Sequence, residues 1–385
     1  MHRPGTALPL PLPLPHVMVV STNADLAGAP SHVRDLVQAL RGRYRFTVVF
    51  GEAGPIEKTL QAAGVTTRIL PGLRSAINPA RDLRAVLALR RLIREFRPQI
   101  LHAHSSKAGL LTRIAGALAS IPVVYTIHGW GFGPGRPRLQ SLIVRSTEKW
   151  FAGLTARYIA VSQADADIGI RALGLDARRI DVIPNAVGES TERAHPDKHA
   201  GFIMVARTDY AKDHETALRA YGSLGLDNPF SCVGGGTDDP AFAARVAQWA
   251  GAGASTVRLL RARTDIPSLL AESGVFVLSS RYEGMPLSII EAMRSGLPVI
   301  ASRVGGVAEL VEDGRTGILV DPGDLEGMKS AMRRLALDPG LRRAMGDAGR
   351  ARYQSGFSLD RMRTRIEGVY DRLLPSDGPV TAVTA

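Results

Sequence analysis

Two glutamates stand eight positions apart in the stretch SSRYEGMPLSIIEAM, which runs over residues 279–293. Between Glu283 and Glu291 lies Pro286, which suits the first position of a helix because it has no N–H group to leave unpaired. Amides at a helix N-terminus bind phosphate readily, and a carboxylate inside the helix could accept both hydroxyls of a ribose. We therefore expect a nucleotide site, although a solvated Glu291 paired with Arg294 stays open as an alternative.

Two cations follow a different apolar segment. Arg207 ends the stretch FIMVAR, and Lys212 comes five residues later, just before an expected helix. A planar guanidinium and a compact ammonium suit a pyrophosphate, and ordinary surface cations are the alternative. The stretch CVGGGT adds Gly234 and Gly235, where the backbone could approach a ligand closely, although such a run is a weak signal alone.

Two histidines lie at the end of an expected strand of the first half, in the stretch LHAHSSKAG. His102 and His104 are two positions apart, so both side chains point to one face of the strand. Ser105, Ser106 and Lys107 come next, where they could cap a helix and bind a phosphate. No third metal ligand of suitable spacing follows, so we expect these residues to shape the acceptor side of a site.

Asp165 and Asp167 form an Asp-x-Asp pair that could also suggest a metal. Ser162 precedes them as an expected N-cap, which puts both acids in the first turn of a helix. Residues two apart on a helix diverge by about 200°, so the pair cannot share one ion and is expected to complement the helix dipole. The sequence predicts no metal and no cofactor.

Short apolar segments alternate with helical periods and must position all these residues. We expect strands at 16–22, 45–51, 66–72, 99–104, 122–129, 158–162 and 180–185 and, after a polar linker at 184–201, at 202–207, 230–235, 257–261, 275–280, 298–302 and 317–322. Such alternation builds doubly wound parallel sheets that bind ligands at the C-terminal ends of their strands. The predicted fold class is α/β, with two doubly wound Rossmann-like domains facing across a cleft.

The expected domains are 16–195 on the acceptor side and 196–357 on the nucleotide side. A helix at 358–374 is expected to pack back toward the first domain. Residues 1–15 alternate proline with leucine, which favours a disordered tail over the continuous helix of a signal peptide. A second tail is expected at 375–385.

The composition of the 385 residues, 45% hydrophobic and 22% charged, is that of a soluble globular protein. Cys232 is the only cysteine, which fits a reducing compartment. No apolar stretch reaches the ~18 residues of a transmembrane helix. We therefore expect a cytoplasmic protein, with a peripheral place on the inner face of the membrane as a further option.

The formal net charge of +12 favours an anionic partner, whether a nucleic acid, a phosphate-bearing substrate or a membrane surface. The stretch 78–98 carries Arg84, Arg91, Arg94 and Arg97 beside an apolar face at helical spacing. It either packs on the core with a solvated basic side or docks on anionic lipid.

These residues, in this order and spacing, resemble the donor domain of GT-B glycosyltransferases of family 4. The resemblance rests on Arg207 and Lys212, CVGGGT, the two glutamates with seven residues between them, and GLPVIASRVGGVAELVEDGRTGILVDPGD. The first half resembles the same family. STNADLAGAPSHVRDLVQAL is similar to its first glycine loop, and LHAHSSKAG with YTIHGWGF is similar to members that build bacterial surface polysaccharides. The likeness runs over roughly residues 17–374.

The resemblance implies metal-independent, retaining transfer of a sugar from a nucleotide diphosphate donor, with UDP expected in preference to GDP. The acceptor would be a polysaccharide or lipid-linked glycan of the cell envelope. Glu291 would hold the ribose, Arg207 and Lys212 the diphosphate, and Glu283 the hydroxyls of the sugar. His128, in YTIHG, would contact that sugar from the opposite domain.

The resemblance also implies that the donor contacts the backbone near the acids and in the first glycine loop. The residues concerned are Gly284, Met285, Pro286, Leu287 and Gly28. Family members often carry Gly-Gly in that loop, whereas this chain has Ala29 at the second position. A methyl group there could narrow the approach of the backbone to a ligand.

Two alternatives stay open. A nucleotide-sugar epimerase of the same fold would turn over without an acceptor, but the clustered acids and histidines expected for proton abstraction are not evident. A basic nucleic-acid-binding protein would need aromatic residues interleaved with its cations. Aromatic residues are only 5% of this chain, so no nucleic-acid partner is expected.

Overall fold

The computed structural model describes residues 14–73, 78–133, 135 and 137–375. Within them the first sheet is parallel, with strand order β3-β2-β1-β4-β5-β6-β7. Its strands are β1 (His16–Ser21), β2 (Arg45–Phe50), β3 (Thr66–Ile69), β4 (Ile100–His104), β5 (Val123–Ile127), β6 (Arg157–Ala160) and β7 (Ile180–Val182). Its core strands β1, β4 and β5 are buried along their whole length, as a sheet covered on both faces requires.

The second sheet is also parallel and has the order β10-β9-β8-β11-β12-β13. Its strands are β8 (Phe202–Val205), β9 (Phe230–Gly234), β10 (Val257–Arg261), β11 (Val275–Leu278), β12 (Val299–Ser302) and β13 (Gly317–Val320). Every predicted strand is therefore present, and most are shorter than predicted. The strand expected at 66–72, for example, ends at Ile69, just before Pro71.

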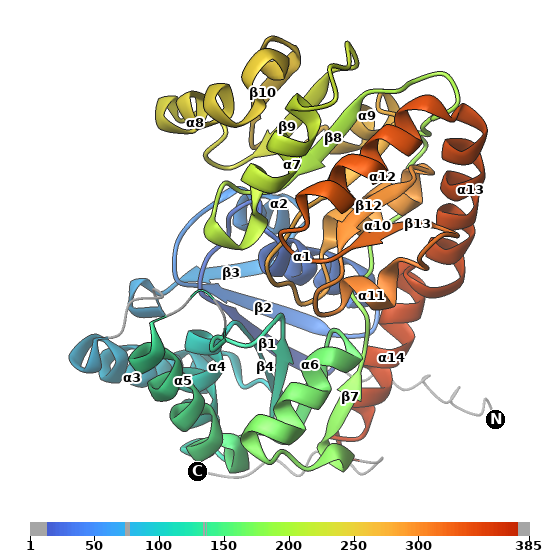
Figure 1. The fold of residues 1–385 in the computed structure, drawn as a ribbon. Helices are drawn as coiled ribbons and strands as arrows, with labels where there is room; N and C mark the ends of the chain where they lie inside the picture. Colours follow the sequence, from blue (N-terminus) through green and yellow to red (C-terminus); the bar gives the residue numbers. More distant parts are fainter. Residues whose placement is uncertain (1–13, 74–77, 134, 136, 376–385) are drawn as a thin grey trace, which may run out of the picture.

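Helices flank both sheets (Figure 1). Those of the first half are α1 (Gly28–Leu40), α2 (Pro55–Ala62), α3 (Pro79–Phe96), α4 (Ser106–Ala117), α5 (Arg138–Trp150) and α6 (Gln163–Ile168). Those that follow are α7 (His214–Gly222), α8 (Pro240–Ala250), α9 (Ile266–Ala271), α10 (Leu287–Ser295), α11 (Val307–Leu310), α12 (Leu325–Leu337), α13 (Pro339–Gly356) and α14 (Leu359–Asp371). The predicted α/β class with two doubly wound sheets is confirmed.

Each sheet changes its direction of winding at one point. In the first sheet this point lies between β1 and β4, and in the second between β8 and β11. Open α/β sheets bind ligands at such switch points, beyond the C-terminal ends of the strands. The strand order therefore places the loop before α1, the end of β4, and the loops after β8 and β11 where ligands are expected.

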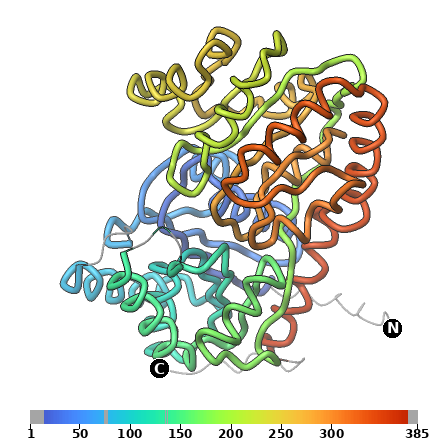
Figure 2. Tube along the Cα trace, viewed as in Figure 1, coloured from blue at the N-terminus to red at the C-terminus, as the bar shows by residue number. Residues whose placement is uncertain are grey.

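The chain crosses from the first sheet to the second through residues 183–201 and later returns. After α13, helix α14 runs back along the first sheet, as the red ribbon and tube show (Figures 1 and 2). Met362, Ile366 and Val369 are buried in the same hydrophobic cluster as residues of α1. The Tyr370 hydroxyl lies 2.6 Å from Nδ1 of His102 in β4, so α14 attaches the C-terminal part of the chain to the first sheet.

The ends of the chain extend past the described region. Of the tails expected at 1–15 and 375–385, residues 1–13 and 376–385 lie outside it. Among the helices that the structure describes, none combines the length and the apolar character needed to cross a membrane.

Candidate active site

Glu283 lies in the loop after β11 and makes two close polar contacts. Its Oε1 lies 2.5 Å from Nζ of Lys212, which comes from the loop after β8, and accepts a hydrogen bond of 2.6 Å from Oγ of Ser280. The side chain of Glu283 is 9% exposed and that of Lys212 is 18% exposed. The two loops at the switch point of the second sheet thus bring a carboxylate and an ammonium group together.

Arg281 fixes the two loops to each other. Its guanidinium donates to Oδ1 of Asp213 at 2.6 Å and to the carbonyl oxygen of Tyr210 at 2.8 Å. Its backbone N–H also donates to the carbonyl oxygen of Ala211 at 2.8 Å. The residues that accept these three bonds are the sequence neighbours of Lys212, so the bonds fix the loop that carries Lys212 beside the loop of Glu283.

Arg207 does not join the pair of Lys212 and Glu283. It is exposed and forms an ion pair of 2.8 Å with Asp209, in the same loop. Gly234 has φ +153°, and a Cβ there would lie 2.1 Å from the carbonyl oxygen of Ala206, so glycine is required where the ends of β8 and β9 meet. Gly235 lies beside Arg207. A Cβ on Gly235 would lie 3.7 Å from Cγ of Arg207, which is an ordinary van der Waals contact.

Helix α10 begins at Leu287, one residue later than predicted, with the buried Pro286 as its N-cap. It has no side-chain cap and no acid in its first turn, so its N-terminal amides and positive dipole end suit an anion. It ends at Gly296, where φ is +86° and glycine is favoured. The phosphate-binding geometry expected from the sequence is therefore available at α10.

Glu291 is half-buried in α10 and does not form the ion pair considered above. Arg294 is buried, and its Nη1 donates to the carbonyl oxygen of Gly188 at 2.9 Å. Burial raises the pKa of Glu291 to about 7, against the lowering effect of Arg294, and Asp35 of α1 raises it further. The carboxyl group therefore titrates near neutral pH and faces charged residues of the first domain.

Donor binding should weaken as the pH falls below about 7 if ionised Glu291 accepts the hydroxyls of a ribose. With the pKa near 7, the ionised fraction falls roughly tenfold from pH 8 to pH 6, and the KM for the donor should rise by a similar factor.

The stability of the folded protein should depend on pH in the opposite sense to donor binding. A raised folded-state pKa means that this group contributes stability below pH 4.5 and that the contribution is lost as the pH rises toward 7. Initial rates at pH 6, 7 and 8 test the first point, with Glu291→Gln expected to flatten the profile.

The loop after β5 meets the acid loop across the two sheets. A Cβ on Gly284 would lie 3.0 Å from the carbonyl oxygen of His128 and 3.0 Å from the amide nitrogen of Gly129. Nearby, Nδ2 of Asn185 donates to the carbonyl oxygen of the buried Met285 at 2.7 Å. His128 is thus brought next to the loop that carries Glu283, although the two residues are 155 positions apart in the sequence.

A second contact between the two halves caps α6. The carboxylate of Glu309 in α11 accepts hydrogen bonds of 2.9 Å from the amides of Gln163 and Ala164. Ser162 caps the same helix by accepting from the amide of Asp165 at 3.1 Å. Asp165 therefore lies in the first turn of α6, as predicted, whereas Asp167 lies beyond that turn and accepts from Nε2 of Gln163 at 2.8 Å.

A buried histidine cluster lies behind this contact. Nδ1 of His104 is 3.0 Å from Nε2 of His128, and the ring of His32, from α1, is centred 4.8 Å from that of His128. Burial lowers the pKa of His32 to about 4 and holds the pKa values of His104 and His128 well below the usual value, with neighbouring histidines adding to the effect on the latter two. All three rings are therefore neutral at pH 7.

A third histidine close to His104 was not predicted, and α1 supplies it as His32, which precedes β4 in the sequence. The nearest ring nitrogens of His32, His104 and His128 all lie within 4.8 Å of one another. Two nitrogens sharing a zinc ion at about 2.1 Å are at most about 4.2 Å apart, so a spread of that size is too wide for one ion unless the rings move. His102 points elsewhere, with Nε2 2.7 Å from Oγ1 of Thr126.

The residues after β4 lie differently from the prediction. Ser105 has φ +75° and donates to Oγ1 of Thr22 at 3.2 Å instead of capping α4, which Ser106 opens. Nζ of Lys107 pairs with Asp82 of α3 at 2.6 Å and is turned toward that helix. Their role at the acceptor side stays a prediction.

The first glycine loop leads into α1. Gly28 is the exposed first residue of this helix, and a Cβ there would meet no atom within 4 Å. The fold itself therefore does not require glycine at this position.

Gly305 and Gly306, which carry no predicted role, support the acid loop from below. Gly305 has φ +47°, and a Cβ there would lie 1.9 Å from the carbonyl oxygen of Glu283. The N–H of Gly306 donates to the carbonyl oxygen of Gly284 at 2.8 Å. The pair of glycines in SRVGGVAEL was the available sequence signal.

Substituting Gly305 by alanine should therefore destabilise the protein and displace Glu283. Strain at positive φ together with this steric clash should lower the free energy of unfolding by about 1–3 kcal/mol, which urea denaturation measures. Gly314→Ala is the matched control, since Gly314 has φ +75° with open space around it. Equal losses in the two variants would show that the contact with Glu283 is unimportant.

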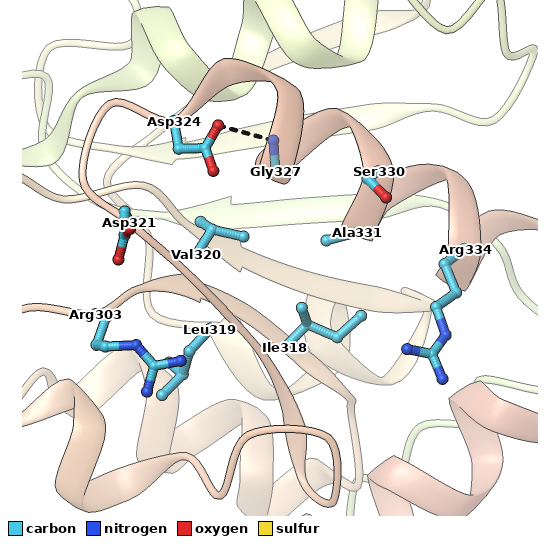
Figure 3. A pocket seen from close by; sticks show the side chains of 10 residues that line it. All are labelled: Arg303, Ile318, Leu319, Val320, Asp321, Asp324, Gly327, Ser330, Ala331 and Arg334. Carbon is cyan, nitrogen blue, oxygen red and sulfur yellow. Dashed lines mark hydrogen bonds between the residues drawn. The ribbon is translucent and has the colours of Figure 1, made fainter.

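A distinct hollow of about 350 Å³ lies between β13 and α12 (Figure 3). Arg303, Asp321 and Arg334 are among the residues that line it. None of the residues at the two switch points lines it, so we do not assign it to the candidate active site.

Comparison with known proteins covers both halves of the chain. The models Glycosyltransferase Family 4 and Glycosyl transferases group 1 match residues 26–190 and 189–352. A UDP-Gal:alpha-D-GlcNAc-diphosphoundecaprenol alpha-1,3-galactosyltransferase of Escherichia coli is 30% identical over 349 residues, covering 85% of this chain and 89% of its own length. A glycogen synthase of Mycobacterium tuberculosis is 29% identical, covering 75% of this chain and 72% of its own length.

Among solved structures, Anabaena HepE in complex with UDP and glucose matches with a TM-score of 0.80 at 20% sequence identity, covering 92% of this chain and 99% of that one. This likeness supports the fold. The sequence matches extend further, because one model spans the histidine cluster and the other spans Lys212 and both glutamates. Given the identity to the galactosyltransferase over most of both chains, the protein belongs to family 4 of the GT-B glycosyltransferases.

Proposed function

We propose that this glycosyltransferase is metal-independent and retaining and that it moves a sugar from a UDP donor to a lipid-linked or polysaccharide acceptor of the cell envelope. The observation that carries the proposal is the Lys212–Glu283 contact of 2.5 Å beside the N-terminus of α10. The loop of His128 faces this contact from the other sheet. A cation, a helix dipole and a carboxylate close together support this loop as the place where a nucleotide sugar would react.

The reaction breaks the bond between the anomeric carbon and the diphosphate oxygen and forms a bond to the acceptor hydroxyl oxygen on the same face. Negative charge develops on the departing UDP, where Lys212, Arg207 and the amides of α10 would stabilise it. Glu283 would accept hydrogen bonds from hydroxyls of the donor sugar. The proton of the acceptor hydroxyl would pass to an oxygen of the departing phosphate.

The choice of UDP and of a lipid-linked acceptor has support from relatives. HepE was solved in complex with UDP and glucose, and the name of the 30% identical galactosyltransferase specifies a UDP-Gal donor and a diphosphoundecaprenol acceptor. The formal net charge of +12 suits both anionic ligands.

Calorimetry with UDP, GDP and ADP in the presence of EDTA tests the donor site. UDP should bind, and Glu291→Ala and Arg207→Ala should each weaken its binding. Because both side chains are at least partly exposed, the variants should stay folded. A folded wild-type protein that binds no nucleotide would contradict the proposed donor site.

Chelation should leave the transferase activity unchanged within about twofold, because fixed cations and amides replace a metal in the proposed mechanism. Transfer of radiolabelled sugar from UDP donors to a lipid-linked diphosphate sugar, measured with and without EDTA, tests this. NMR of the new linkage tests retention. A rate that falls to background with EDTA and returns with a divalent cation would overturn metal independence.

The basic face of α3 supports a further element of the proposal, contact with anionic lipid headgroups. Arg84, Arg91, Arg94 and Arg97 are exposed, while Leu89 and its apolar neighbours pack on the core. Arg94 and Arg97 also line a hollow of about 530 Å³ beside the end of α4. Such a cluster attracts a negatively charged membrane surface.

A further inference from the structure

Helix α5 exposes large apolar side chains along one face. Leu139 is 71% exposed, Leu142 59%, Ile143 48% and Trp150 85%. Their spacing of three, four and eleven residues from Leu139 puts all four within a stripe about 100° wide on a helix. A helix that only covers a sheet turns such a stripe inward, whereas α5 turns it outward.

The charged residues of α5 complete this inverted arrangement. Arg138, Arg145 and Lys149 are exposed and follow one edge of the apolar stripe. Nε of Arg145 donates to the carbonyl oxygen of Ala172 at 3.1 Å. The acid of this helix, Glu148, points inward and is buried, so the outer surface of α5 carries cations beside apolar groups.

The surroundings of α5 extend the same surface toward the active site. α3 and α5 both pack on α4 and lie on one side of the molecule (Figure 1). α3 adds Leu83 and Leu87, which are 62% and 45% exposed. The loop that leads into α5 reaches the acid loop, since a Cβ on Gly135 would lie 3.3 Å from the ring of Tyr282.

We infer that α5 lies in the interface of an anionic bilayer, with its apolar stripe among the acyl chains and its cations at the lipid phosphates. This goes beyond electrostatic contact through α3, and it does not depend on which sugar the enzyme transfers. Tryptophan and leucine beside arginine and lysine are the composition of interfacial helices. A second copy docked by the same face would bring like charges together, which favours lipid as the occupant.

The test uses the full chain and vesicles of phosphatidylglycerol and phosphatidylcholine. Cosedimentation measures partition, and tryptophan emission reports insertion, because Trp150 is exposed whereas Trp130 and Trp249 are partly buried. The stripe variant replaces Leu139, Leu142 and Ile143 by serine. The matched control is Leu337→Ser, since Leu337 of α12 is 70% exposed and remote in sequence from this surface.

We expect wild type and Leu337→Ser to bind anionic vesicles with a blue shift of tryptophan emission, and the stripe variant to partition at least tenfold more weakly. Circular dichroism should show the stripe variant folded, because the replaced side chains are exposed. Unchanged binding by the stripe variant would overturn the inference, even if an α3 arginine variant lost binding. Oligomers of wild type that the stripe variant alone dissociates, without vesicle binding, would assign the face to a second copy.

Discussion

Replacing Lys212 by methionine should lower kcat by about 10²–10³-fold and leave the protein folded. Its ammonium group is the cation in contact with Glu283, at 2.5 Å, and is 18% exposed. Removing one preorganised group that stabilises developing charge typically costs this much. Arg207 could not compensate, because its side chain is 60% exposed and pairs with Asp209.

Single-turnover transfer from a UDP sugar, with a thermal melt of each variant, measures this effect. Lys212→Arg keeps the charge and should recover part of the rate. Arg178→Met is the matched control, since it removes an exposed cation paired with Asp176 at 2.9 Å, just before β7 of the first sheet. A fall of less than fivefold in Lys212→Met would remove Lys212 from the chemistry.

Much of this site could be predicted because parallel α/β sheets repeat one geometric rule. Apolar segments with turn residues at their ends located all thirteen strands of the described residues, and ligands gather at the C-terminal ends of such strands. Lys212 and Glu283 both follow strands at the switch point, β8 and β11. Their meeting is therefore a consequence of strand order, whereas the family resemblance implied only that both side chains contact the donor.

The contacts that could not be predicted join segments far apart in the chain. Asn185 reaches Met285, and Glu309 caps a helix that begins at Gln163. Nothing in the local sequence indicates such partners, because spacing rules apply only within one helix or strand. His32 was missed for the same reason, since its partners come from the strands that follow much later.

The orientation of α5 also could not be predicted from the periodicity of its apolar residues. A stripe of apolar residues predicts amphipathicity but not which side faces the core. Here the choice is made by Arg113 of α4, whose side chain is fully buried and whose Nη2 lies 2.7 Å from Oε2 of the 4% exposed Glu148. This ion pair holds the polar side of α5 inward and leaves its apolar stripe outside.

Substituting Arg113 by methionine should lower the free energy of unfolding by about 3–5 kcal/mol, because it leaves the carboxylate of Glu148 buried and unpaired. Burial already raises the pKa of Glu148, against the lowering effect of Arg113. Without the guanidinium the pKa should rise further. A raised folded-state pKa stabilises at low pH, so the variant should recover stability as the pH falls through the pKa of Glu148 and lose it as the pH rises.

Urea denaturation of Arg113→Met, Glu148→Leu and the double variant at pH 5 and pH 8 distinguishes the cost of an unpaired buried carboxylate from the net contribution of the ion pair. Replacing both partners of a buried ion pair by apolar residues is often close to neutral, so the double variant should recover most of the stability lost in Arg113→Met. If this ion pair holds α5 in place, Arg113→Met should also lose vesicle binding. The double variant, in which two apolar side chains pack between α4 and α5, should retain it. A double variant that is as unstable as Arg113→Met at both pH values would show that the pair is not what fastens α5 to α4.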